Sequence, residues 1–173
     1  MENQANSKSI ILNYGLILGG ISILPGLIKY AMGANYLEND WISSVISLGL
    51  TVAFIVLGIK KFKSENEGFL SWGQGVKVGL GIVLISMIIS IAYLLLFTNF
   101  IEPDFKNQVI ESSIVKWQDA GMTSDQIEMT TKMTNDYFEL SLYGSIVVMS
   151  LFLGFVFSAI IAAIMKKSEE ETY

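Results

Sequence analysis

Four long stretches of the chain carry no charged residue, and they constrain its fold more than any other feature. A helix rises about 1.5 Å per residue, so about 20 residues cross a hydrocarbon core roughly 30 Å thick. Lipid offers no partners to exposed backbone N–H and C=O groups, so such segments cross as helices. The stretches are 19 to 26 residues long and run over Ser9–Ile28, Trp41–Ile59, Val78–Ile101 and Leu140–Met165.

These stretches predict an all-α membrane protein with four transmembrane helices, built as a single membrane domain over residues 1–173. We place the spans at about 10–31, 41–60, 76–100 and 139–165. An alternative for the first stretch is a signal peptide, with Ala31-Met32-Gly33 as a possible cleavage site. The apolar region of a signal peptide is usually about 7–15 residues, which favours a retained span.

Lysines predict the orientation, because cytoplasmic loops next to spans are enriched in basic residues. Seven lysines fall on the side that holds both termini and the link between spans two and three. They are Lys8, Lys60, Lys61, Lys63, Lys77, Lys166 and Lys167. The other side holds Lys29, Lys106, Lys116 and Lys132. We therefore expect both termini in the cytoplasm.

The segment 102–138 is the only long link, and its pattern predicts an amphipathic helical hairpin on the outer side. Gly121 is a plausible stop for its first helix, and Thr123 with Gln126 forms a capping-box pattern at the start of the second. No Pro or Gly separates the second helix from span four, so those two helices could form one.

Acids outnumber lysines eight to three between Glu102 and Glu139. One interpretation is a solvated face that keeps the hairpin soluble. A second is a docking surface for a partner protein, with a metal site as a third and weaker alternative, since no EF-hand spacing and no His are present. The candidate partner surface consists of Glu111, Trp117, Asp119, Asp125 and Glu128.

Small residues recur four apart within spans one and three. In lipid, such spacing lets helix backbones approach closely, within one chain or between chains. The candidate helix-packing residues are Gly15, Gly19, Gly75, Gly79, Ser86 and Ser90. The same pattern serves bundles and dimers, so it leaves the oligomeric state open.

Composition excludes several kinds of chemistry. The chain has no Cys and no His, and all eleven basic residues are Lys, so thiol nucleophiles, imidazole bases and guanidinium clamps are absent. The net charge of −5 argues against nucleic acid as a partner. Gly73-Gln74-Gly75 follows no strand, which argues against nucleotide binding. We assign no catalytic, cofactor-binding or metal residue and expect membrane lipid as a partner.

Three motifs, in this order and spacing, carry a resemblance to a known family. They are Gly68–Gly79 (GFLSWGQGVKVG), Ile101–Phe105 (IEPDF) and Gly121–Glu128 (GMTSDQIE). Nearly the whole chain resembles the DUF4199 family, small four-helix membrane proteins of Bacteroidota. The resemblance implies a Gram-negative inner membrane and a periplasmic hairpin. The family has no established activity. The gene neighbourhood that the resemblance implies makes a polyprenol-phosphate glycosyltransferase a candidate partner.

Three functional hypotheses follow. The leading one is a non-enzymatic protein that acts through interaction, as an accessory subunit of an envelope system. The alternative is a lipid or small-molecule carrier or flippase, with a groove between spans one and three. The least favoured is a membrane enzyme, which would need hairpin acids to converge on a pocket near Tyr30 or Tyr36.

Overall fold

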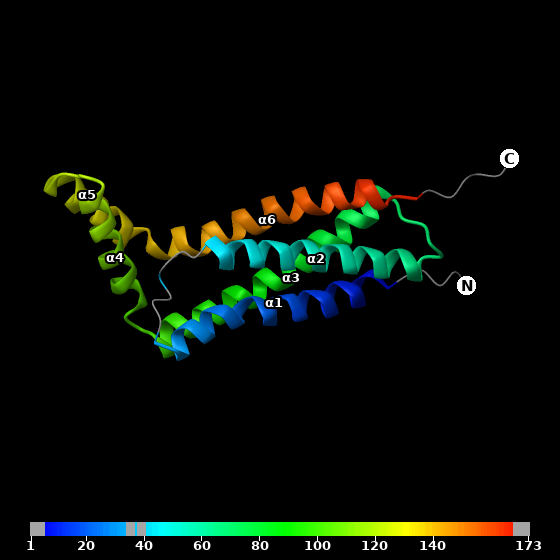
Figure 1. Cartoon of the computed structure of the whole chain (residues 1–173), viewed down its shortest axis with the longest axis horizontal. Helices are drawn as coiled ribbons and strands as arrows, with labels where there is room; N and C mark the ends of the chain where they lie inside the picture. Colours follow the sequence, from blue (N-terminus) through cyan, green and yellow to red (C-terminus); the bar gives the residue numbers. More distant parts are fainter. Residues whose placement is uncertain (1–5, 34–36, 38–40, 168–173) are drawn as a thin grey trace.

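The computed structural model describes residues 6–33, 37 and 41–167, and this part of the chain is almost entirely helical (Figure 1). Its elements are α1 (Ser7–Ala31), α2 (Trp41–Glu65), α3 (Trp72–Leu96), the π-helical turn η1 (Phe97–Ile101), α4 (Phe105–Asp119), α5 (Ser124–Asp136) and α6 (Phe138–Met165). The helices α1, α2, α3 with η1, and α6 are each long and apolar enough to cross a membrane. The predicted fold, four long apolar helices with a short helix pair between the third and fourth, is confirmed.

Local side-chain contacts explain where the span helices begin and end. The Asn6 side chain accepts a hydrogen bond from the backbone N–H of Ser9, which caps α1. Ser71 and Gln74 form a capping box at the start of α3. The other end of α3 widens into η1, where the Glu102 N–H donates to the carbonyl of Phe97 at 2.8 Å. The sequence did not predict this π turn.

Helix α3 packs along α1 through glycines, and the two helices run parallel. Three contacts follow in one register: Ile11 against Gly81, Gly15 against Ile85, and Gly19 against Ile89. A Cβ atom built on any of these glycines would lie within 2.6–2.7 Å of the facing isoleucine. The partners in each pair are 70 positions apart, so the register is constant over two turns.

Helix α3 packs along α6 in the same way, but antiparallel. Gly75 meets Ala162, Gly79 meets Ser158, and Val83 meets Gly154. The Ser158 side chain is fully buried, and its hydroxyl has no hydrogen-bond partner among the described residues. The predicted packing residue Ser86 is also buried, and the hydroxyl of Ser90 donates to its carbonyl at 3.0 Å.

Backbone and side-chain hydrogen bonds fasten one end of this α3–α6 pair. Leu70 and Lys167 exchange two backbone hydrogen bonds of 2.9 Å, in the same register as the helix contacts. The ammonium group of Lys63 donates to the carbonyl of Met165 at 2.7 Å. The indole N–H of Trp72 donates to the carbonyl of Ala159 at 3.1 Å. We call this end, where α1 and α3 begin and α2 and α6 finish, the lysine-rich end.

The bundle is packed unevenly along its length. The largest fully buried apolar side chains of the described residues gather in one cluster, which α2 completes by covering α3. They are Leu18, Ile55, Ile59, Leu70, Val78 and Ile82. At the opposite end, nearly every residue of Trp41–Gly49 in α2 is exposed. Gly144 of α6 likewise has no neighbour within 4 Å of an added Cβ. Figure 1 shows α3 leaving α6 toward this end and crossing to lie beside α1.

We expect Gly79→Ala to destabilise the bundle and Gly144→Ala to leave its stability unchanged or slightly higher. The new methyl group at position 79 would lie 2.8 Å from the Ser158 Cβ and 2.9 Å from the Ile55 Cγ2, and such overpacking costs about 1–3 kcal/mol. The matched change at position 144 meets no neighbour and gains helix propensity. Thermal unfolding followed by tryptophan fluorescence measures both. Equal melting temperatures would contradict the close α3–α6 contact.

Candidate interaction surface

Aromatic rings attach the hairpin formed by α4 and α5 to the end of the bundle. The rings of Tyr30 and Phe97 lie 5.2 Å apart, those of Phe97 and Phe105 6.0 Å, and those of Phe105 and Phe138 6.4 Å. All three pairs are edge-to-face, an arrangement that ring quadrupoles favour. The series joins α1, η1, α4 and α6, and Phe97 and Phe138 are buried within it.

Polar contacts add to this attachment. The Lys106 ammonium lies 3.6 Å from the Glu139 carboxylate and 5.5 Å from the centre of the Phe138 ring. Because both partners of this ion pair are partly exposed, it contributes no more than about 1 kcal/mol. The side-chain amide of Gln108 donates to the Glu102 carboxylate at 2.8 Å. These contacts orient the first turns of α4 over the end of the bundle.

The turn between α4 and α5 is built as its sequence predicts. Gly121 has φ of +78°, a backbone conformation that favours glycine, and the Met122 N–H donates to the carbonyl of Trp117 at 3.1 Å. Thr123 and Gln126 form a complete capping box at the start of α5. The predicted stop and cap are confirmed. The sequence also allowed α5 and α6 to form one continuous helix. The structure has two helices instead, because Tyr137, with φ −113° and ψ 17°, separates α5 from α6.

The predicted partner-surface acids all lie exposed on the hairpin. Glu111 and Asp119 are on α4, and Asp125 and Glu128 are on α5, while Trp117 is half-buried. Within the described part of the chain, no group of three or more acidic, His or Cys side chains is placed to hold a metal ion. The arrangement is therefore a spread of negative charge over a surface.

The structure exposes an apolar stripe on the second helix of the hairpin. The sequence pattern predicts Ile127, Met133, Tyr137 and Phe138 on the apolar side of this helix. Of these, Phe138 is buried and Ile127 half-buried, but Met133 and Tyr137 are 57% and 58% exposed. Met129, 63% exposed, and Met133 lie on one face of α5, and Tyr137, the C-cap of this helix, continues the stripe at four-residue spacing. Helix α5 buries none of its residues.

The other candidate sites receive less support from the geometry. The groove considered between spans one and three is filled by Ile85 and Ile89 at the levels of Gly15 and Gly19. An acidic pocket near Tyr30 would need converging carboxylates, but the Glu102 and Glu139 carboxylates contact Gln108 and Lys106 respectively. Tyr36 lies outside the described residues.

We expect Phe105→Ala to loosen the hairpin while leaving the spans folded. The substitution removes two edge-to-face ring contacts, each worth about 0.5–1.5 kcal/mol. Hydrogen exchange followed by mass spectrometry measures the effect, and amides of α4 should exchange about tenfold faster or more. Val115→Ala, at an exposed position of the same helix, is the control and should change little. Unchanged exchange in both variants would contradict attachment through Phe105.

Comparison with known proteins adds a family to this description of a multi-pass membrane protein. No curated protein and no solved structure matches the chain. A family profile described as "Protein of unknown function (DUF4199)" matches residues 13–167. The match extends from the second turn of α1 to Lys167, which pairs with Leu70 at the lysine-rich end. Because the match covers nearly the whole chain, the protein belongs to the DUF4199 family.

Proposed function

We propose that the protein is a non-enzymatic accessory subunit of an envelope system and binds a partner protein through its hairpin. The observation that carries this proposal is the exposed stripe Met129, Met133 and Tyr137 on an ordered hairpin that also exposes several carboxylates. The docking surface comprises this stripe and the residues Glu111, Trp117, Asp119, Asp125 and Glu128.

Physical chemistry favours a protein over a lipid surface at this stripe. Helices that lie on a membrane usually carry Lys or Arg on their polar face, which attracts anionic headgroups. The hairpin carries the opposite charge, with eight acids and three lysines from Glu102 to Glu139. A partner with an apolar patch beside basic residues would match both features. The family resemblance makes a membrane-bound polyprenol-phosphate glycosyltransferase the first partner to test.

The proposal includes an orientation, with both termini in the cytoplasm and the hairpin in the periplasm of a Gram-negative cell. It is supported by the seven lysines at the lysine-rich end, because basic residues next to spans stay in the cytoplasm. The hairpin extends from the opposite end of the bundle (Figure 1).

Labelling of introduced cysteines tests this orientation, because the natural chain has none. Gln118 and Ser64 are exposed residues at opposite ends of the bundle. In spheroplasts, we expect a membrane-impermeant maleimide to label the Gln118→Cys variant and to label Ser64→Cys only after lysis. The reverse pattern would invert the orientation.

Site-specific photocrosslinking tests the docking surface. A photoreactive amino acid at Met133 should give a discrete adduct with a single membrane protein in native membranes, whereas one at Asn135 should not. Both positions are exposed, and they lie on different faces of α5. Asp125→Asn with Glu128→Gln should reduce the Met133 adduct several-fold, since it removes the charge complementarity. Equal adducts from both positions, or none from Met133, would contradict the proposal.

A further inference from the structure

Two lysines on neighbouring helices lie at about the same level of the α1–α3 contact. Lys8 comes three residues before Ile11, and Lys77 comes four residues before Gly81. Because Ile11 contacts Gly81 and the helices run parallel, each lysine lies one turn closer to the lysine-rich end, near the α1–α3 seam. Both side chains are exposed.

Each lysine is followed by a row of apolar side chains on the same face of its helix, and both rows lie on the same side of this seam. We call these rows the lysine-headed stripes. On α1, Lys8 is followed at four-residue steps by Leu12 and Leu16, and on α3 Lys77 shares a face with Leu84 and Ile88. At about 100° per residue, both stripes turn to the same side of the seam. Leu12, Leu16 and Ile88 are exposed and Leu84 is half-buried.

Helix α2 covers the other side of the seam. Tyr14 of α1 contacts Phe54 of α2 with ring centres 6.3 Å apart, and Ile82 of α3 lies against Gly58 of α2. Tyr14 and Ile82 each point away from the lysine-headed stripes. The side bearing Lys8 and Lys77 is therefore open to the surrounding lipid.

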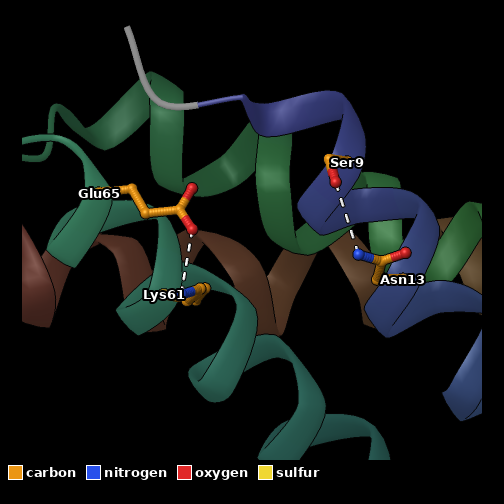
Figure 2. Close-up of polar contacts among 4 residues, drawn as sticks. All are labelled: Ser9, Asn13, Lys61 and Glu65. Carbon is orange, nitrogen blue, oxygen red and sulfur yellow. Dashed lines mark hydrogen bonds and ion pairs between the residues drawn. The ribbon is translucent and has the colours of Figure 1, made fainter. Parts of the chain in front are cut away.

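The electrostatics at this level favour an anion. Helix α1 begins at this level, and the N-terminal end of a helix carries a partial positive charge that adds to the two ammonium groups. Two other lysines of this end have their own partners: Lys61 pairs with Glu65 at 3.1 Å (Figure 2), and Lys63 donates to the carbonyl of Met165. Figure 2 also shows that the side-chain amide of Asn13 donates a hydrogen bond to the hydroxyl of Ser9 within α1.

We propose that Lys8 and Lys77 bind the phosphate of an anionic phospholipid whose acyl chains lie along Leu12, Leu16, Leu84 and Ile88. Each lysine is the last charged residue before a charge-free span, which places both at the boundary between headgroups and hydrocarbon. A phosphate held there has apolar side chains directly beneath it, as a phospholipid requires and a free phosphate ion does not. This site is independent of the hairpin and of any partner bound there.

Native mass spectrometry of the purified full-length protein tests the site, with phosphatidylglycerol and phosphatidylcholine as probes. We expect wild-type protein to bind phosphatidylglycerol more tightly than phosphatidylcholine. The double substitution Lys8→Gln with Lys77→Gln should weaken phosphatidylglycerol binding roughly 10- to 30-fold, as expected for the loss of two lysines at a lipid surface. Phosphatidylcholine binding should change little.

The matched control is Lys60→Gln with Lys166→Gln, which removes two exposed lysines from the same end but away from the seam. This control should keep phosphatidylglycerol affinity within a few-fold of wild type. An equal loss in both double variants would overturn the seam site and leave only general attraction to a basic end. No loss in the Lys8 and Lys77 variant would overturn it as well. If inorganic phosphate at equal concentration displaced the lipid, the ligand would be a free phosphate ion, which would also overturn a phospholipid site.

Discussion

The bundle depends on the close approach of α3 to both α1 and α6, and glycine permits that approach on both sides. Between spans, lipid supplies no hydrophobic driving force, so helices associate through tight van der Waals contact. Gly15 and Gly19 receive the isoleucines of α3, while Gly75 and Gly79 bring α3 against Ala162 and Ser158. With α3 held on two faces, α2 completes the core by packing over it, and α1 and α6 reach each other mainly through these two helices.

This arrangement leaves the two ends of the bundle with different properties. The lysine-rich end contains the buried cluster and the backbone pairing of Leu70 with Lys167. The opposite end contains fewer buried side chains, and its principal described connections are the rings around Phe97 and Phe105. A well-packed base thus supports a hairpin that is attached by a few aromatic and polar contacts, and the hairpin exposes its acids and its methionine stripe to its surroundings.

Features that depend on short stretches of sequence could be predicted, and features that depend on distant neighbours could not. Span helices follow from charge-free length, and the Gly121 turn and the Thr123 cap follow from local backbone chemistry. The apolar pattern of α5 predicted an amphipathic helix, but periodicity does not say what covers a face, so the exposure of Met133 required the structure. Phe97, Phe105 and Phe138 come together only because the end of α3 and the starts of α4 and α6 lie at one place. In the π turn, the Thr98 and Asn99 side chains donate to the carbonyls of Leu94 and Leu95. Thr51 and Ser90 make the same four-residue contact within regular α-helix, so such contacts do not predict a π turn.

The backbone pairing of Leu70 with Lys167 also limits how the helices move. It continues the register in which Gly75, Gly79 and Val83 meet α6, so α6 cannot slide along α3 without breaking two backbone hydrogen bonds and displacing three interlocked contacts. Rotation of α6 about its own axis is blocked by the same contacts. Between Phe138 and Gly154, by contrast, α6 buries none of its residues, so its tight contacts are concentrated in the half nearer the lysine-rich end. Because the hairpin joins the far ends of α3 and α6, a ligand that changed the spacing of α4 and α5 would act on the less tightly packed half of α6.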